Sequence, residues 1–178
     1  MSRASTLRAL LQRGRMVVAP GAIDGITGGA IERAGFAAAY MTGAGTAMTL
    51  GYPDYGLNTM SEMVANAQRI VESTTIPLIS DADTGYGNEL NVFRTVREFE
   101  RVGVAAIHIE DQVFPKRCGH LDNKEVTSRE DYLAKIRAAA DASTDAEEGA
   151  EQAQATNTTT TVVATPEPEP QLKEDADV

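Results

Sequence analysis

The sequence has 178 residues, which is enough for one domain with a hydrophobic core. Its formal charge of −10 argues against nucleic acid or an anionic membrane surface as a partner, because both are bound through clustered lysine and arginine. The single cysteine, Cys118, excludes an intrachain disulfide, and no apolar run approaches the roughly 18–20 residues of a membrane span.

The N-terminal segment contains arginines but no acidic residue before Asp24. This composition, rich in arginine and poor in acidic residues, is typical of organelle transit peptides. However, Leu7, Leu10 and Leu11 have the spacing of one helix face, which favours an ordinary first helix. We therefore expect a cytoplasmic protein, with a mitochondrial location as the alternative.

Strand-like and helix-like segments then alternate along the chain. Residues 16–20 form a short apolar run ended by proline and predict a buried strand. A helix is expected over about residues 23–34, with Gly35 as its C-terminal cap. Residues 37–41 predict the second strand, which leads into a glycine-rich loop at residues 42–46.

The same alternation continues as far as residue 140. Helices are expected over residues 61–73, 89–102 and 128–140, and strands over residues 76–80 and 105–109. Ser61 is a candidate cap for the first of these helices. Because the strands are nearly continuous apolar runs separated by helices, the pattern is typical of parallel strands covered by helices in an α/β fold.

The alternation stops near residue 142. Residues 142–178 hold nine acidic residues and one lysine, so the rest of the chain is nearly neutral. Residues 143–178 also lack aromatic residues and include a threonine run and a Pro-Glu repeat. Because this composition buries too little apolar surface to offset the entropy of ordering, we expect a folded domain at residues 1–142 and a disordered acidic tail at residues 143–178.

Acidic residues follow two of the predicted strands. Asp81 and Asp83 alternate, so their carboxylates can face one side, and Glu110 follows the next strand. Paired carboxylates with room for water suit Mg²⁺. An EF-hand is excluded because Tyr86 and Val92 stand where its glycine and glutamate are required, whereas a simple turn remains the alternative for this motif taken alone.

Two further motifs point to carboxylate chemistry. Cys118 lies within Lys-Arg-Cys-Gly-His, whose cationic groups are expected to depress the pKa of the thiol and to bind a carboxylate. A buried, inert cysteine is the alternative, but the flanking charges make its burial costly. The segment 43–48 lacks the third glycine of a dinucleotide loop and is better suited to offer backbone N–H groups to a carboxylate.

Together these features resemble the isocitrate lyase/phosphoenolpyruvate mutase superfamily over about residues 5–142. The Lys-Arg-Cys-Gly-His motif is similar to that of its lyase branch, which includes methylisocitrate and dimethylmalate lyases. The matching motifs are Tyr40-Met-Thr-Gly-Ala-Gly45, Leu50-Gly-Tyr-Pro-Asp54, Asp81-Ala-Asp-Thr-Gly-Tyr-Gly87, Ile109-Glu-Asp-Gln112 and Lys116-Arg-Cys-Gly-His120.

The resemblance implies roles for some of the residues in these motifs. The metal, Mg²⁺ or alternatively Mn²⁺, would lie near Asp54, Asp81, Asp83 and Glu110. The catalytic residues would be Cys118, as acid/base on a mobile loop, and Tyr40, which would assist deprotonation of the substrate hydroxyl. The substrate would be held by Thr42, Gly43 and Ala44 at its 2-oxo acid portion, and by Lys116, Arg117, Gly119 and His120 at another carboxylate.

The implied function is Mg²⁺-dependent C–C cleavage of a small 2-hydroxy di- or tricarboxylate similar to methylisocitrate, releasing a 2-oxo acid such as pyruvate. The implied fold is a (β/α)₈ barrel in a homo-oligomer. A whole barrel needs about 250 residues, so the roughly four βα units here are expected to form its N-terminal half. An inactive half-barrel is one alternative, and an oxaloacetate decarboxylase or hydrolase or a phosphonomutase is another.

Overall fold

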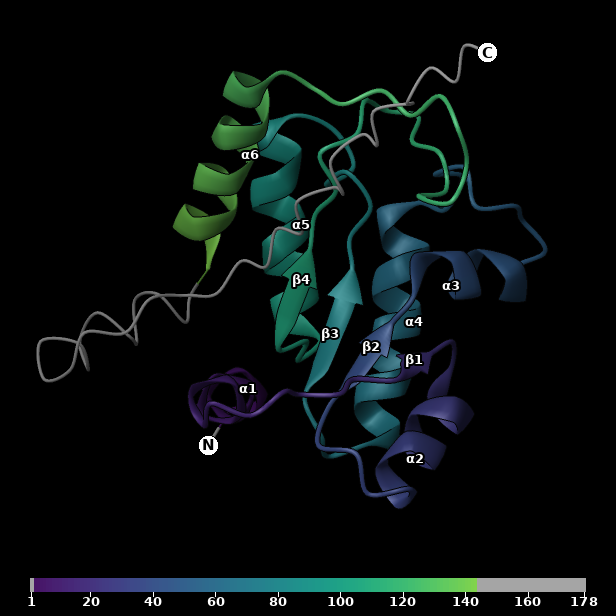
Figure 1. The fold of residues 1–178 in the computed structure, drawn as a ribbon, viewed down its shortest axis with the longest axis vertical. Coiled ribbons are helices and arrows are strands. Elements are labelled where there is room, and N and C mark those ends of the chain that lie inside the picture. The colour runs from purple at the N-terminus through teal and green to yellow at the C-terminus, as the bar shows by residue number, and fades with distance from the viewer. Residues whose placement is uncertain (1, 144–178) are drawn as a thin grey trace, which may run out of the picture.

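The structure is a computed structural model that describes residues 2–143 (Figure 1). The predicted acidic tail therefore lies outside the described residues, apart from Ser143. Within the described range, the chain alternates between helices and short strands. None of the helices in that range is both long and apolar enough to cross a membrane.

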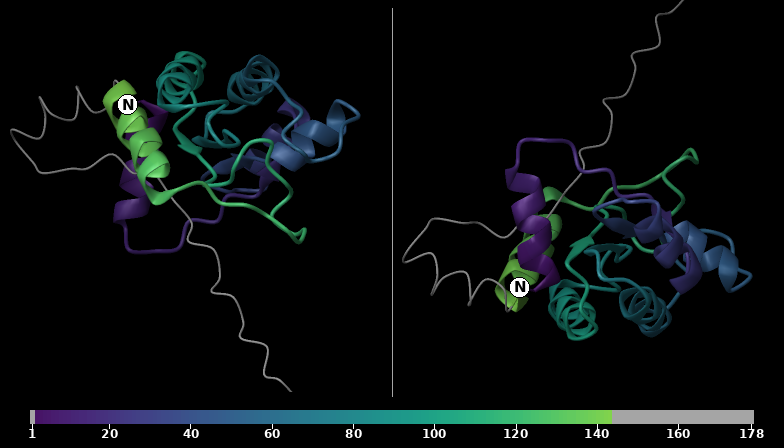
Figure 2. Two further views of the ribbon diagram at one scale, coloured as in Figure 1. Left: turned by 90° about the horizontal axis from the view of Figure 1, so that it is seen from above. Right: turned by 90° about the horizontal axis from the view of Figure 1, so that it is seen from below.

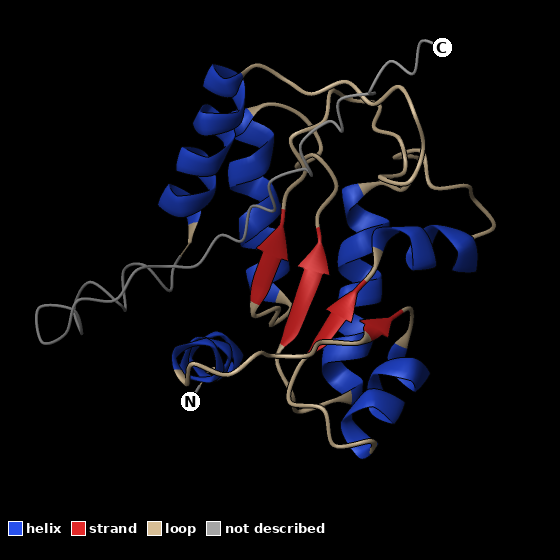
Figure 3. Cartoon of the chain, viewed as in Figure 1, coloured by secondary structure: helices blue, strands red, loops and turns tan. Residues whose placement is uncertain are grey.

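Four parallel strands form one sheet in the order β1-β2-β3-β4 (Figure 3). The strands are β1 (Gly21–Ala22), β2 (Ala39–Met41), β3 (Leu78–Asp81) and β4 (Ala106–His108). Each strand is followed in the chain by its neighbour in the sheet. Because the crossovers between parallel strands have the same handedness, all three run over the same face of the sheet. The predicted parallel α/β architecture is confirmed.

Helices lie on both sides of this sheet. The helices are α1 (Arg3–Gln12), α2 (Gly25–Arg33), α3 (Gly43–Thr49), α4 (Met60–Ser73), α5 (Glu89–Arg101) and α6 (Arg129–Ala142). Helices α2, α4 and α5 cover one face of the sheet, and α1 lies on the opposite side from α4 and α5 (Figure 2). Helices α2, α4, α5 and α6 contact one another in that order, and Figure 2 shows α4 and α5 side by side along the sheet. The core between them and the strands includes the fully buried Phe99, Ile70 and Leu78.

Side-chain caps determine where the longer helices begin. Thr59 caps α4 and forms a capping box with Glu62, so Ser61, the predicted cap, lies inside the helix. Asn88 caps α5 in the same way. Helix α2 ends at the cap residue Ala34, and Gly35, the predicted helix-ending glycine, follows it with a φ of +86°.

The structure corrects two predictions in the N-terminal part. Residues 16–20 are not a buried strand: Met16 is 91% exposed, and the backbone ladder with β2 begins only where the Tyr40 N–H donates to the Pro20 carbonyl. The predicted glycine-rich loop instead opens helix α3. Thr42 caps this helix by accepting a hydrogen bond from the Gly45 N–H, which offsets the low helix propensity of its glycines.

Candidate active site

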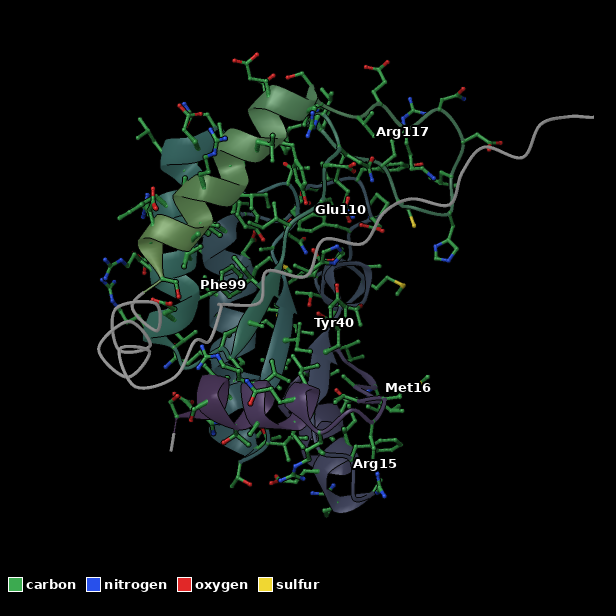
Figure 4. All side chains as sticks on the ribbon, turned by 60° about the vertical axis from the view of Figure 1, so that its left-hand side comes forward. Arg15, Met16, Tyr40, Phe99, Glu110 and Arg117 are labelled. Carbon is green, nitrogen blue, oxygen red and sulfur yellow. The ribbon has the colours of Figure 1, made fainter. Side chains whose placement is uncertain are left out.

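The predicted site residues gather where the parallel strands end. Tyr40 lies in β2 and Asp81 ends β3, while Glu110 follows β4 by two residues. Figure 4 shows Tyr40 and Glu110 on the same side of the sheet, with Phe99 lying toward the helices. The carboxyl ends of parallel strands are the edge at which α/β proteins bind ligands.

The turn after β3 fixes two carboxylates. Asp81 accepts hydrogen bonds from the Gly43 N–H, at 3.1 Å, and from the Asp83 N–H, at 2.8 Å. Asp83 has a φ of +52°, a left-handed conformation that non-glycine residues rarely adopt. A Cβ at Gly43 would lie 2.5 Å from Asp81 Oδ2, so only glycine allows this approach between α3 and β3.

Lys116 is buried among the acidic residues and does not extend into solvent. Its side chain is 5% exposed, and its Nζ lies 2.8 Å from Asp54 Oδ1 and 3.4 Å from Glu110 Oε1. Burial would lower the pKa of Lys116, but the hydrogen bond to Asp54 and the charge of Glu110 raise it well above the ordinary value. In this structure Lys116, predicted as a substrate ligand, is the counter-ion of two predicted metal ligands.

Among the described residues, no three histidine, cysteine, aspartate or glutamate side chains lie close enough to hold a metal ion together. The chemistry of the site nevertheless suits Mg²⁺, which prefers oxygen ligands and keeps several of its waters. Burial raises the pKa of Asp83 and of Glu110, and the charge of Asp81 raises both further. A hydrated cation between these carboxylates would offset that repulsion.

Two buried polar atoms support the same conclusion. Asn58 Oδ1 and Tyr86 Oη have no hydrogen-bond partner among the described residues, and both residues line a small cavity that Asp54, Asp81 and Asp83 also line. Unpaired buried polar atoms are costly unless an ion or ordered water satisfies them. The waters of a bound Mg²⁺ would satisfy them, so the residues present fit the ion.

Tyr40 is paired with a histidine that sequence reasoning did not assign to the site. Its hydroxyl lies 3.1 Å from His108 Nδ1. Burial raises the pKa of Tyr40, and the charges of Asp81 and Glu110 raise it further, so the hydroxyl is protonated. The signal that could have identified His108 was its position two residues before Glu110, on the same face of the strand.

The loop that carries Cys118 has a fixed base and an exposed outer part. Gln112 forms the base, because its side chain donates to Glu110 and to the Arg117 carbonyl and accepts from the Arg117 N–H. Cys118 Sγ lies 3.7 Å from His120 Nδ1. Arg117, Gly119 and His120 are exposed, and Figure 4 shows Arg117 in the outer loop beyond Glu110.

The first turn of α3 offers fewer free groups than predicted. The Gly43 N–H already donates to Asp81, so it is not available to a substrate in this structure. The Thr42 hydroxyl accepts from the Gly45 N–H and keeps its own proton for a ligand. Ala44 lies in the first helical turn, where backbone N–H groups have no intrahelical acceptor.

Known proteins are similar to this chain in sequence and in fold. The model of the family described as phosphoenolpyruvate phosphomutase matches residues 7–150. The 2,3-dimethylmalate lyase of Eubacterium barkeri is 56% identical over 142 residues, which are 79% of this chain and 49% of that protein. The 2-methylisocitrate lyase of Aeropyrum pernix is 49% identical over 140 residues, 79% of this chain and 46% of that protein.

A solved structure of a related protein has a similar fold. A phosphonopyruvate hydrolase crystallised with oxalate and Mg²⁺ is 34% identical and superposes with a TM-score of 0.76, over 83% of this chain and 50% of that one. The chain thus spans about half the length of the relatives it matches.

Proposed function

Because this chain belongs to the phosphoenolpyruvate mutase/isocitrate lyase superfamily, we propose that it carries the metal-binding and acid/base half of a Mg²⁺-dependent C–C lyase site. Its four βα units correspond to about half of a (β/α)₈ barrel. The substrate would be a small 2-hydroxy carboxylate related to 2,3-dimethylmalate or 2-methylisocitrate, and the product a 2-oxo acid such as pyruvate.

One observation carries this proposal: Asp54, Asp81 and Asp83 line one small cavity near the carboxyl ends of the strands, and Lys116 links Asp54 to Glu110 beside it. Asp81 and Asp83 would hold the metal directly or through water, and Asp54 and Glu110 would complete its surroundings. When bound, Mg²⁺ would stabilise the negative charge on the substrate's 2-oxygen after its hydroxyl is deprotonated and would polarise the 2-oxo acid that forms. The ion pairs of Lys116 with Asp54 and Glu110 support this proposal, because they place a positive charge beside these acids.

The protein's own groups would handle the protons of a retro-aldol cleavage. The substrate's 2-hydroxyl would lose its proton to the Tyr40 hydroxyl, as that group passes its own proton to His108 3.1 Å away. The Thr42 hydroxyl would donate to the 2-oxo acid portion. Cys118, with His120 beside it, would protonate the carbanionic fragment when the loop covers the site.

A chimaera tests this proposal. Residues 1–142 would be joined to the part of E. barkeri 2,3-dimethylmalate lyase that follows the matched region, which supplies the other half of the barrel. With Mg²⁺, we expect 2-oxo acid release from 2,3-dimethylmalate or 2-methylisocitrate, and at least a hundredfold loss with Cys118→Ser or Asp83→Ala.

Two outcomes would contradict the proposal. One is a folded chimaera that releases no 2-oxo acid from either substrate. The other is a chimaera whose turnover survives Asp83→Ala. Assays of oxaloacetate and of phosphonopyruvate on the same preparation distinguish the lyase from the hydrolase and mutase alternatives.

A further inference from the structure

Helix α6 donates two side-chain hydrogen bonds to the backbone beside the candidate metal ligands. Lys135 Nζ donates to the Thr84 carbonyl at 2.8 Å, and Thr84 directly follows Asp83. Tyr132 Oη donates to the Ile109 carbonyl at 3.0 Å, and Ile109 directly precedes Glu110. One helix is therefore attached to both of the chain segments that carry these carboxylates.

The spacing of the two donors along α6 allows both hydrogen bonds to form. Tyr132 and Lys135 are three residues apart, so they lie on one face of α6. Their carbonyl partners belong to separate segments that are already joined, because the Glu110 N–H donates to the Asp83 carbonyl at 2.8 Å. The hydrogen bonds from α6 thus flank the contact between the two acid-bearing segments.

The turn after β3 needs such support because its backbone is strained. Asp83 and Tyr86 have φ values of +52° and +61°, and non-glycine residues keep this conformation only where their surroundings enforce it. From α5, Thr95 Oγ1 donates to the Gly85 carbonyl at 3.2 Å. From α6, Lys135 holds the neighbouring Thr84 carbonyl, so the two helices fix consecutive peptide groups of this turn.

Lys135 is also unusual for a lysine on a helix, because its charged side chain is partly removed from water. The side chain is half-buried, and burial lowers its pKa, against the opposing charges of Asp131 and Asp83. A lysine at a helix surface ordinarily keeps its ammonium in water. Here the ammonium instead donates to the carbonyl of Thr84, the residue that follows Asp83.

Building on the function proposed above, we propose that Lys135, together with Tyr132, is a positioning residue for the metal-binding carboxylates. It fixes the turn so that Asp83 and Glu110 present their oxygens to one hydrated Mg²⁺. Metal affinity depends on such outer contacts, because an ion that keeps its waters tolerates little displacement of the carboxylates that bind those waters.

The test measures Mn²⁺ binding to the 178-residue chain by electron paramagnetic resonance, so it does not depend on turnover. Lys135→Met should raise the dissociation constant about 10–100-fold. Lys135→Arg should recover it to within a few-fold, since a guanidinium can still donate to the Thr84 carbonyl. Arg137→Met, which removes an exposed cation from the same helix, is the matched control and should leave the affinity unchanged.

Tyr132→Phe is a milder second variant and should weaken Mn²⁺ binding several-fold, and circular dichroism should show all variants folded. Wild-type affinity in both Lys135→Met and Tyr132→Phe would overturn the inference. So would equal losses in Lys135→Met and Arg137→Met, since that result indicates a general charge effect. If the wild-type chain binds no Mn²⁺, or if Asp83→Asn binds it equally well, the proposed metal site itself fails and the inference fails with it.

Discussion

At the scale of single residues, Lys116 determines how the acidic site behaves without metal. Its ammonium is buried between Asp54 and Glu110. Removing one partner of a buried ion pair leaves the other charges uncompensated. Lys116→Met should therefore lower the free energy of unfolding of the metal-free chain by about 2–4 kcal/mol, near the lower end of the range for buried pairs because both acids keep some exposure.

Mg²⁺ should recover part of that loss, because a cation would then neutralise the same acids. The check is urea unfolding of wild type and Lys116→Met with and without Mg²⁺. Since the pKa of Lys116 is raised in the folded state, its stabilising effect is complete at neutral pH and is lost only as the pH rises above the ordinary pKa of lysine. Unchanged stability at pH 7 would show that the ion pairs contribute little.

Cys118 should be a reactive thiol in the folded protein. It is partly exposed, and its Sγ lies 3.7 Å from His120 Nδ1. We expect iodoacetamide to alkylate the native chain at a rate comparable with that of the denatured chain or faster, and His120→Gln to slow the native reaction several-fold. Mass spectrometry of timed samples gives both rates. A thiol protected until denaturation would assign Cys118 to the inert class of buried cysteines.

At the scale of elements, the helices with strong apolar periodicity were predicted most closely, whereas β1 and α3 were not predicted. The predicted helices at 61–73 and 89–102 differ from α4 and α5 by a single residue at one end. Strand β1 has two residues and no periodicity, and α3 begins with glycines that disfavour a helix. Helix α3 is held by tertiary contacts, such as Asn66 Nδ2 donating to Thr46 Oγ1, which a local pattern does not contain.

The same distinction applies to the site. The acidic residues after β3 and β4 were recognisable because polar side chains follow apolar strands. The ion pairs of Lys116 depend on the path of a loop, and Lys135 and Tyr132 lie in an ordinary helical pattern. Their roles come from which backbone atoms the fold places opposite them, and this information is not local in the sequence.

The junction between β2 and α3 gives a prediction at this scale. In Gly43→Ala, the added Cβ would lie 2.5 Å from Asp81 Oδ2, so either Asp81 or the start of α3 must move. We expect Mn²⁺ affinity to fall at least tenfold, whereas the melting temperature of the metal-free chain changes by only a few degrees. Gly14→Ala is the control: a Cβ there meets nothing within 4 Å, and its φ of +66° strains the backbone, so stability should fall while Mn²⁺ affinity stays unchanged. Equal Mn²⁺ binding by Gly43→Ala and wild type would contradict the proposed use of Asp81.

At the scale of the whole molecule, the described sheet has two open edges. Within residues 2–143, β1 and β4 each pair with a strand on one side only. Apolar side chains near the β1 edge are exposed, including Met16 at 91% and Val18 at 55%. In a closed barrel, by contrast, every strand is paired on both sides and the interior is filled.

A polypeptide of these 178 residues, made by itself, should therefore show little lyase turnover although it contains the proposed metal ligands. Unpaired strand edges and exposed apolar surface favour association and dye binding. We expect it to bind the hydrophobic dye ANS and to sediment as a mixture of species, whereas the chimaera that supplies four more βα units should bind less dye and gain turnover. The measurement is 2-oxo acid release with Mg²⁺ for both proteins at equal concentration. Turnover near 1 s⁻¹ by the 178-residue chain alone, in the ordinary range of enzymes, would show that these four units are sufficient for catalysis, and the open edges would then have to be closed by another copy of the chain.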